Sequence, residues 1–285
     1  TPKPSSAASD VYKRQHQYPQ SAQIPFVELL NLGGFATSTF FLLSGFILTH
    51  VYFAQSSDLR GGTRAFFVKR LSNLYPIHLF SLALVLLVSV AGTRAFSEFA
   101  TLSLSDGGDE LVHLGQTATA FNFVLNLAMV QVWNPPYGSV NPSSWSLATL
   151  LFFYITFPFL APRIMAFRKK ALLLLLLWVA YMVPPVVASS MNWFGPVAVG
   201  IVTRNPLLRL PEFASGIVLY GLYREQRLSL FTATAGRRFL TLVFVALSFA
   251  AAAWLVADGA LFWRYIVHNG CLLYTSDAAD EGLGV

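Results

Sequence analysis

The sequence predicts an all-α fold in which several helices cross a membrane. Of its 285 residues, 55% are hydrophobic and only 11% are charged, whereas a soluble globular domain carries about 25% charged residues. The apolar residues gather in runs of about twenty, the length at which a helix crosses a bilayer. These runs are continuous rather than alternating, which favours helices over the strands of a transmembrane barrel. The sequence therefore predicts one polytopic transmembrane helix bundle, and it excludes a disordered chain or a disulfide scaffold.

Six strong apolar runs predict membrane spans, and three weaker runs accompany them. A run of this length covers roughly 30 Å of hydrocarbon at about 1.5 Å per helical residue. The strong runs lie at about residues 36–54, 74–92, 145–161, 171–190, 206–223 and 239–257. The weaker runs lie near residues 24–34, 117–133 and 260–270.

Basic residues between the runs predict the orientation of the bundle, because Lys and Arg favour the cytoplasmic side. The acidic stretch 93–116 and the uncharged stretch 191–203 are expected outside. The basic connections are expected in the cytoplasm, near residues 60–70, 163–170 and 224–238. This arrangement requires that 117–133 enters the membrane without crossing it. The alternative is a full crossing that places one basic cluster outside.

Two hydrophilic peptides at the ends of the chain differ from the rest of it. Residues 5–15 read SSAASDVYKRQ and residues 271–281 read CLLYTSDAADE. A DNA sequence that encodes the first peptide encodes the second when its complementary strand is read one base out of register. We therefore interpret residues 1–15 and 271–285 as translated sequencing-adapter DNA. Residues 16–270 are then the transmembrane domain, a fragment of a gene that is cut at both ends.

Two stretches of the first half place small or basic residues beside apolar ones. One reads FFLLSGFILTH at residues 40–50, and its Ser44-Gly45 step allows close helix packing in a membrane. The other reads FFVKRLSNLYPIH at residues 66–78. It predicts that a helix begins at its Tyr-Pro pair, because proline loses no hydrogen bond in a first turn.

Two further stretches follow in the second half. One reads NPSSWSLATLLFFY at residues 141–154, and Ser143 or Ser144 is placed to cap the helix that follows. The other reads NPLLRLPEF at residues 205–213, and it spaces Arg209 and Glu212 three residues apart. That spacing lets the two side chains pair on one helical face.

In this order and spacing, the four stretches resemble the membrane acyltransferase type 3 family over most of residues 16–270. Members of that family O-acylate sugars and other hydroxyl compounds from acyl-CoA. The resemblance implies a helix bundle of about ten spans, of which this chain would retain about seven to eight.

The resemblance also implies a catalytic histidine at the end of the first span, with an arginine eleven positions before it. His16 has the right place relative to the Ser44-Gly45 step, and Ser5 of the adapter peptide holds the position of the arginine. A neutral imidazole can take the proton of a hydroxyl that attacks a thioester, a contribution of about 10²–10⁴-fold. We expect His16 to be this base, and we expect the fragment itself to be inactive. The alternative is that His16 is a solvated loop residue.

Other roles follow from the remaining stretches. Lys69 and Arg70 are expected to bind CoA phosphates, with ordinary anchoring on the cytoplasmic side as the alternative. Acyl-CoA is expected as a co-substrate, with no permanently bound cofactor. The substrate pocket is expected to be shaped by polar, small and aromatic residues of the other three stretches: Ser44, Trp145, Ser146, Arg209 and Glu212.

Two positions depart from the family pattern. A glutamate usually follows the Trp-Ser-Leu motif where this chain has Leu150, and a second arginine usually stands where it has Asn73. Either change indicates a divergent subfamily or an inactive copy. No His, Asp or Glu cluster has metal-ligand spacing, and Cys271, the only cysteine, lies in an adapter peptide. The basic residues are too scattered for nucleic-acid binding.

The resemblance implies a multi-pass O-acyltransferase of the bacterial inner membrane, with the lipid bilayer around it. It would move an acyl group, expected to be acetyl, to a hydroxyl of a carbohydrate or a similar acceptor, as in polysaccharide modification. One alternative is a transporter or flippase component, which would show inverted internal symmetry. Another is a non-catalytic member of the acyltransferase-like family.

Overall fold

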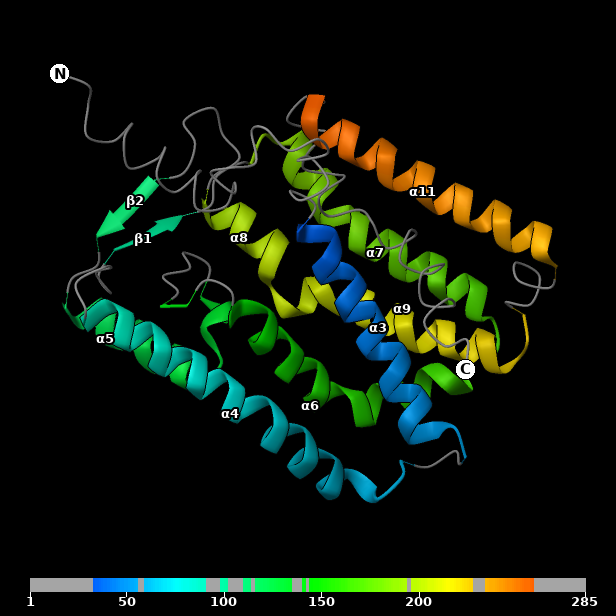
Figure 1. Ribbon diagram of the computed structural model, residues 1–285, viewed down its shortest axis with the longest axis horizontal. Coiled ribbons are helices and arrows are strands. Elements are labelled where there is room, and N and C mark those ends of the chain that lie inside the picture. Colours follow the sequence, from blue (N-terminus) through cyan, green and yellow to red (C-terminus); the bar gives the residue numbers. More distant parts are fainter. Residues whose placement is uncertain are drawn as a thin grey trace. The chain divides into compact units, whose positions relative to one another are not determined.

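The computed structural model describes residues 33–55, 59–90, 98–101, 110–113, 116–134, 140–141, 144–193, 196–227 and 234–258, and most of them lie in helices (Figure 1). In chain order the helices are α3 (Gly33–Phe53), α4 (Gly62–Val90), α5 (Gln116–Leu127), α6 (Trp145–Ala166), α7 (Lys170–Ser190), α8 (Pro196–Arg204), α9 (Pro206–Arg224) and α11 (Ala235–Asp258). A short 3₁₀ helix, η2 (Gln131–Trp133), follows α5. Two four-residue strands, β1 (Glu98–Thr101) and β2 (Glu110–His113), pair antiparallel. The all-α fold predicted from the sequence is confirmed.

Each of the six strong apolar runs forms one of these helices. Among the described residues, three helices are long and apolar enough to cross a membrane: Gly62–Leu87, Trp145–Ala166 and Lys170–Ser190. A shorter apolar helix spans Thr37–Phe53. The chain is therefore a membrane protein, and its total number of spans stays a prediction.

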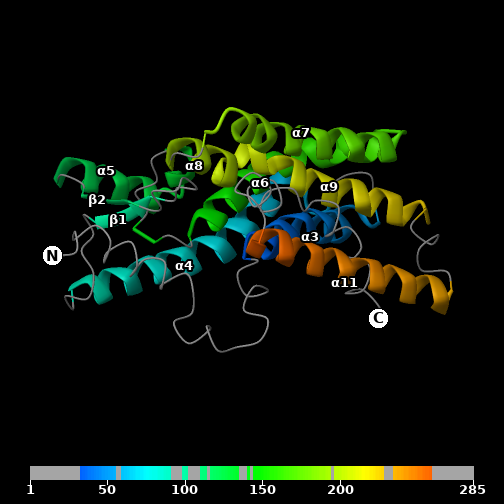
Figure 2. The same ribbon diagram turned by 90° about the horizontal axis from the view of Figure 1, so that it is seen from above.

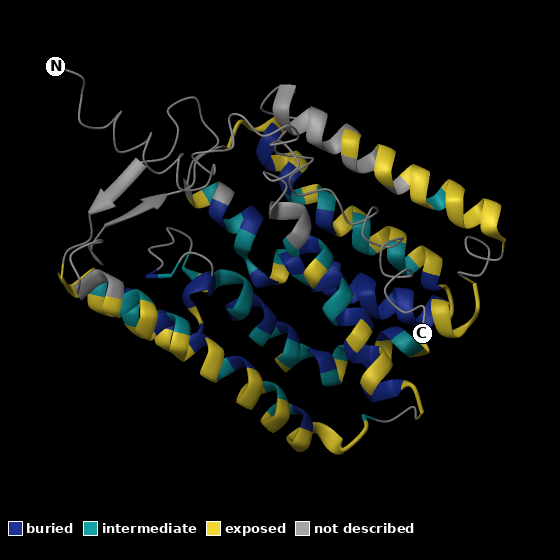
Figure 3. Cartoon of the chain, viewed as in Figure 1, coloured by how far each residue is buried: buried dark blue, intermediate teal, exposed yellow. Residues whose placement is uncertain are grey.

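Large apolar side chains cover the outside of several helices. Phe80 of α4 is 72% exposed, and most described side chains of α11 are exposed as well (Figure 3). On α7 the exposed apolar residues include Leu172, Leu175 and Leu176. A water-soluble protein rarely exposes contiguous apolar surface of this kind. These faces fit the hydrocarbon of a bilayer.

The structure corrects the predicted start of the second span. We expected a helix to begin at Tyr75-Pro76, but α4 begins at Gly62 and contains Pro76 in its interior. Proline removes one backbone hydrogen bond from a helix, which membrane helices tolerate where neighbouring groups satisfy the freed carbonyl. Lys69 and Arg70 therefore lie within a helix and not in a connecting loop.

Two stretches expected to be connections contain regular structure. The stretch 93–116 contains the β1–β2 pair, and the stretch 191–203 contains most of α8. With nine residues, α8 is too short to give a span-length apolar run. By contrast, α5 has 12 residues and is about 18 Å long at 1.5 Å per residue. It is shorter than the hydrocarbon core. That 117–133 enters the membrane without crossing it stays a prediction.

Contacts along the chain divide it into two compact units. Among the described residues, the first unit comprises those of Arg64–Ile155 and Met191–Leu208. The second comprises those of Glu28–Thr63, Thr156–Ser190 and Arg209–Val285. Helices α6 and α9 begin in the first unit and continue into the second.

In the first unit, aromatic and polar contacts join α4 to α5 and α6. Phe66 of α4 is buried, and its ring lies 6.3 Å from the Tyr154 ring of α6 in an edge-on arrangement. The Tyr75 hydroxyl donates a hydrogen bond to the Leu127 carbonyl at the end of α5, at 3.0 Å. These contacts bring together segments that are far apart in the sequence.

The second unit has a core of phenylalanines from α3, α6 and α9. The Phe157 ring lies 5.8 Å from that of Phe53 and 6.0 Å from that of Phe213. All three side chains are buried. Aromatic pairs prefer such tilted and edge-on arrangements to face-to-face stacking. This core holds α3 and α9 side by side (Figure 2).

Candidate functional site

A buried ion pair lies in the first turns of α9. Arg209 Nη1 is 2.6 Å from Glu212 Oε1, and the two side chains are 2% and 0% exposed. The three-residue spacing places both on one helical face, as the sequence predicts. Charged side chains that are fully buried are costly unless they are paired, and in membrane proteins they often mark functional sites. The pair is therefore the leading candidate site of the second unit.

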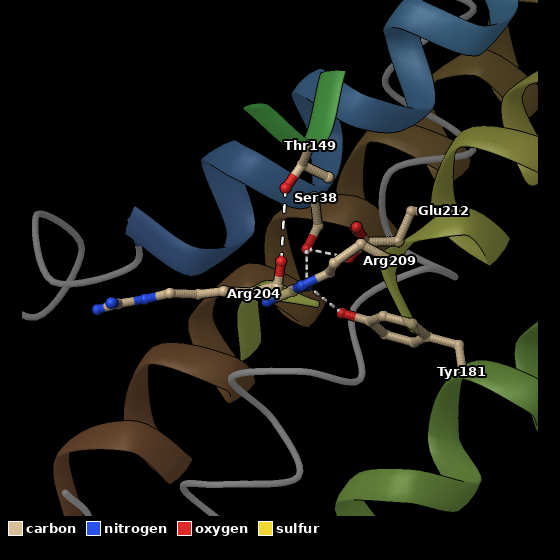
Figure 4. Close-up of polar contacts among 6 residues, drawn as sticks. All are labelled: Ser38, Thr149, Tyr181, Arg204, Arg209 and Glu212. Carbon is tan, nitrogen blue, oxygen red and sulfur yellow. Dashed lines mark hydrogen bonds and ion pairs between the residues drawn. The ribbon is translucent and has the colours of Figure 1, made fainter. Parts of the chain in front are cut away.

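Two hydroxyl groups complete the environment of this ion pair (Figure 4). Ser38 of α3 donates to Glu212 Oε1 at 2.6 Å, and Arg209 Nη1 donates to the Tyr181 hydroxyl of α7 at 2.6 Å. The Arg209 guanidinium also lies 5.7 Å from the centre of the Tyr181 ring. Among the described residues no donor reaches the second carboxylate oxygen, Glu212 Oε2. The pair thus keeps one open acceptor inside the protein.

Two glycines set the distance between the helices that carry these groups. A Cβ atom on Gly45 of α3 would overlap the carbonyl oxygen of Phe213, and one on Gly216 of α9 would overlap that of Leu42. Small residues let membrane helices approach until their backbones touch. The Ser44-Gly45 step of the sequence therefore serves close packing of α3 against α9. This packing brings a hydroxyl of α3 to the ion pair.

A family comparison decides the assignment of the chain. A family model described as an acyltransferase domain matches residues 9–275, almost the whole length. The chain belongs to the acyltransferase type 3 family. The match extends a few residues into each terminal peptide, 1–15 and 271–285, and both peptides lie outside the described residues. The adapter interpretation stays a prediction.

One curated relative supports the same family. The acyltransferase MdmB of Streptomyces mycarofaciens is 30% identical over 154 residues, which cover 53% of this chain and 34% of the relative. The aligned part thus spans about a third of the relative's length. No solved structure matches the chain. The family groups transferases of acyl groups other than amino-acyl groups.

The predicted site residues of this acyltransferase-family chain fall in both units. The second unit contains Ser44, Arg209 and Glu212, and the first contains Lys69, Arg70, Trp145 and Ser146. The Ser44 hydroxyl donates to the carbonyl of Phe40 in its own helix at 2.7 Å. Within the described residues it makes no hydrogen bond to the ion pair. The structure brings Arg209 and Glu212 together and leaves the pocket role of Ser44 a prediction.

The basic pair of α4 is Lys69 and Arg70, and Arg70 contacts α6. Lys69 is exposed, and the Arg70 guanidinium lies 5.8 Å from the centre of the Tyr154 ring. Asn73, where the family pattern has arginine, is exposed on the same helix. A guanidinium over an aromatic face is held by cation–π attraction. Arg70 is therefore oriented by α6, while Lys69 is open to a ligand.

The start of α6 contains two of the predicted site residues. Trp145 and Ser146 are half-buried in its first turn. The Ser144 hydroxyl donates to the carbonyl of Asn141 at 2.7 Å. Ser143 lies outside the described residues, and capping by either serine stays a prediction. Leu150 is buried, so an apolar side chain fills the position where the family pattern has a carboxylate.

The predicted catalytic base lies beyond what the structure describes. His16 is outside the described residues. Among the described residues there is no group of His, Cys, Asp and Glu side chains that could hold a metal ion. The catalytic role of His16 stays a prediction.

Sequence reasoning missed the two hydroxyl partners of the ion pair. Ser38 and Tyr181 lie on other helices, and nothing in their local sequence indicates a distant charged partner. The one signal is composition, since each is a hydroxyl residue inside an apolar run. The helix start predicted at the Tyr75-Pro76 pair would also place His78 in a first helical turn, whereas it is buried near the middle of α4.

A second charged cluster lies in an open depression of about 540 Å³ in the second unit. Lys170, only 6% exposed, donates to Glu225 at 2.5 Å and to the Phe167 carbonyl at 3.1 Å. The hydrogen bond from Lys170 holds the pKa of the Glu225 carboxyl below its ordinary value. Arg168 and Arg227 also line the depression. Positively charged side chains therefore outnumber the one carboxylate around it.

Proposed function

We propose that the protein is a membrane O-acyltransferase that moves an acyl group from acyl-CoA to a hydroxyl of a carbohydrate or similar acceptor. The family match over residues 9–275 carries this proposal. The buried ion pair of α9 supports it, because an enzyme of a membrane needs polar groups where its substrates meet. Acetyl is the proposed acyl group, and no permanently bound cofactor is part of the proposal.

The proposed reaction is attack of a hydroxyl on a thioester. The hydroxyl oxygen bonds to the acyl carbon, the carbon–sulfur bond breaks, and CoA leaves as a thiolate. His16 is the proposed base that takes the hydroxyl proton and returns it to the thiolate. A sugar hydroxyl is a poor nucleophile, so this proton transfer is the step at which the protein contributes most.

Lys69 and Arg70 are the proposed contacts for the CoA phosphates. Lys69 is exposed and Arg70 is oriented by the Tyr154 ring, so one cation is open and one is preorganised. Arginine binds phosphate oxygens in a fixed geometry, and lysine acts as a point charge. Their place at the basic start of α4 also supports a cytoplasmic position, where acyl-CoA occurs.

The remaining predicted residues are proposed to contact the substrate, each within its own unit. Arg209 and Glu212 form a rigid charged group inside the second unit, while Trp145 and Ser146 supply an aromatic face and a hydroxyl in the first. Ser44 is retained in this set as a small residue. We propose the bacterial inner membrane as the location, with several spans and with the basic helix ends in the cytoplasm.

The test is transfer of labelled acetyl from acetyl-CoA by membrane vesicles. The assay uses an extended chain, with a membrane span and an arginine added ahead of His16. Replacing both Lys69 and Arg70 by glutamine is expected to raise the KM for acetyl-CoA by about tenfold or more, because the loss of even one charge-assisted contact has about that effect. Arg168→Gln is the matched control, because it removes a positive charge from the second unit.

An equal rise in KM for Arg168→Gln would show that overall charge, and not this pair, attracts acyl-CoA. An extended chain that neither transfers nor hydrolyses acetyl-CoA would support a non-catalytic family member. That second candidate is favoured by Leu150, whose buried apolar side chain stands at the family's glutamate position.

A further inference from the structure

The first unit contains a buried histidine that the proposed reaction does not use. His78 lies near the middle of α4, a helix apolar enough to cross a membrane, and its side chain is 0% exposed. Buried polar groups are costly unless they are hydrogen-bonded. The partners of the two imidazole nitrogens therefore show which nitrogen is still available to a ligand.

One imidazole nitrogen is satisfied and the other is open. His78 Nε2 lies 2.7 Å from the backbone carbonyl oxygen of Asn126 on α5. A carbonyl oxygen only accepts hydrogen bonds, so Nε2 carries the hydrogen. In the neutral imidazole Nδ1 is then a bare acceptor. No donor in the described part of the chain reaches His78 Nδ1.

A second open acceptor belongs to Gln131 of η2, which is 2% exposed. Its amide nitrogen donates to the Ser144 hydroxyl at 3.0 Å. That hydroxyl itself donates to the Asn141 carbonyl at 2.7 Å, so it must accept from glutamine. This fixes which amide atom is the oxygen. Across the described ranges no donor reaches Gln131 Oε1.

Hydrogen bonds connect the two residues that carry these open acceptors, through the His78 backbone carbonyl and the Gln131 amide nitrogen. Ser81 donates to the His78 carbonyl at 2.9 Å, and the Asn141 side-chain amide donates to the Ser81 hydroxyl at 3.3 Å. Asn141 is also the partner of Ser144. We call this set the His78 cluster: His78, Ser81, Gln131, Asn141 and Ser144. All five residues belong to the first unit, and none carries a carboxylate, ammonium or guanidinium group.

We propose that the His78 cluster binds a neutral ligand through its hydroxyl groups, with His78 Nδ1 and Gln131 Oε1 as acceptors. These two uncharged acceptors lack hydrogen-bond donors, so they complement a molecule that donates hydrogen bonds from hydroxyl groups. Without a cation the cluster does not suit phosphates, and without a carboxylate it does not suit a buried ammonium group. Resting on the proposed function, the ligand is the hydroxylated acceptor of acyl transfer, and the cluster is its recognition subsite.

The test is ¹⁵N NMR of the full chain, labelled at histidine and held in lipid nanodiscs without acyl-CoA. The His78 Nδ1 resonance is assigned by its loss in His78→Gln, whose side-chain amide can still donate to Asn126. The probes are the methyl glycosides of glucose, galactose, mannose and rhamnose. At least one glycoside is expected to shift the Nδ1 resonance saturably toward that of a hydrogen-bonded acceptor. Gln131→Met is expected to weaken this binding about tenfold, the effect of losing one hydrogen bond.

Two controls separate recognition from general sugar effects. The shift should persist in His50→Gln, a histidine variant of the second unit, and should be absent with fully O-methylated glycosides, which cannot donate. Monodeoxy glycosides test the same hydrogen bonds without any protein variant, should Gln131→Met not fold. No saturable shift with any of the four glycosides would overturn the proposal. An equal shift with the O-methylated glycosides would also overturn it. A third contrary result is an Nδ1 resonance that is already that of a hydrogen-bonded nitrogen and that no glycoside changes, because it indicates a bound water only.

Because this binding is measured without acyl-CoA, its result does not depend on whether the protein transfers acetyl. Saturable glycoside binding in a protein without transferase activity would support ligand binding by the His78 cluster and refute the proposed function. Acetyl transfer without glycoside binding would support the proposed function and refute ligand binding by the cluster.

Discussion

Removing the carboxylate of Glu212 is expected to destabilise the protein strongly. Its Oε1 accepts from Arg209 and from Ser38, each at 2.6 Å, and its side chain is 0% exposed. Hydrogen bonds to charged groups contribute about 1.5–3 kcal/mol each, and breaking one side of a buried ion pair costs about 3–5 kcal/mol. Glu212→Ala loses both bonds and leaves the arginine charge buried. We therefore expect it to cost about 3–5 kcal/mol.

Two further variants show whether the charge pair is the cause. Glu212→Gln keeps an acceptor for Ser38 and Arg209, so its cost should be smaller, about 1–3 kcal/mol. The double variant Arg209→Met with Glu212→Met removes both charges, and buried pairs replaced in this way are often neutral. It should cost less than Glu212→Ala alone. Ser44→Ala is the control, and its expected change is about 0.5 kcal/mol or less.

The assay is unfolding of the purified chain in mixed detergent micelles, followed by tryptophan fluorescence. Folded yield after membrane extraction gives a second readout with the same expected order. If the double variant is less stable than Glu212→Ala, the two residues do not act as a pair and the reasoning is wrong. An equal cost for Glu212→Gln and Glu212→Ala would show that volume, and not hydrogen bonding, matters at this position.

Three other predictions concern packing, pH and the chain ends. Gly216→Ala should cost about 1–3 kcal/mol or more, because its new methyl group meets the α3 backbone; unchanged stability in the same unfolding assay would contradict the close helix contact. Glu225→Gln should lower the thermal midpoint at pH 7. Since the pKa of Glu225 is lowered by Lys170, the pair's contribution is present above the ordinary carboxyl value of about 4.3 and is lost as pH falls through the lowered one. The gap between variant and parent should therefore close at acid pH, and a gap that stays constant from pH 7 to pH 3 would refute the ion pair. Deleting residues 1–15 and 271–285 should change stability by about 0.5 kcal/mol or less, and a clear loss would count against the adapter interpretation.

The helices could be predicted because each depends on a local property of the sequence. A continuous apolar run near twenty residues long gives a helix in lipid whatever its neighbours are. This is why the runs at 171–190 and 206–223 match α7 and α9 within one residue at each end. Elements of four to nine residues carry no such run, so the β1–β2 pair and α8 were missed.

The candidate site was predictable only where its partners are close in sequence. Arg209 and Glu212 are three residues apart, and helical geometry alone brings them together. Ser38 is 174 residues from Glu212, so its contact depends on how α3 packs against α9. His78 was passed over for the same reason, because its partner Asn126 lies 48 residues away on a short helix. The contacts of Ser38 and His78 depend on tertiary packing, which the pattern of a single sequence does not reveal.

The most direct test of the acyltransferase assignment is labelled acetyl transfer in vesicles by the chain extended with a membrane span and an arginine ahead of His16, compared with the same extended chain carrying His16→Ala. The extended chain is expected to transfer or hydrolyse acetyl-CoA, and His16→Ala is expected to reduce the rate by about 10²–10⁴-fold, the contribution of a positioned base. His50→Ala, the matched histidine control, should retain the rate. Full activity in His16→Ala would contradict the assignment of the base, and no activity in the extended chain would contradict the proposed function.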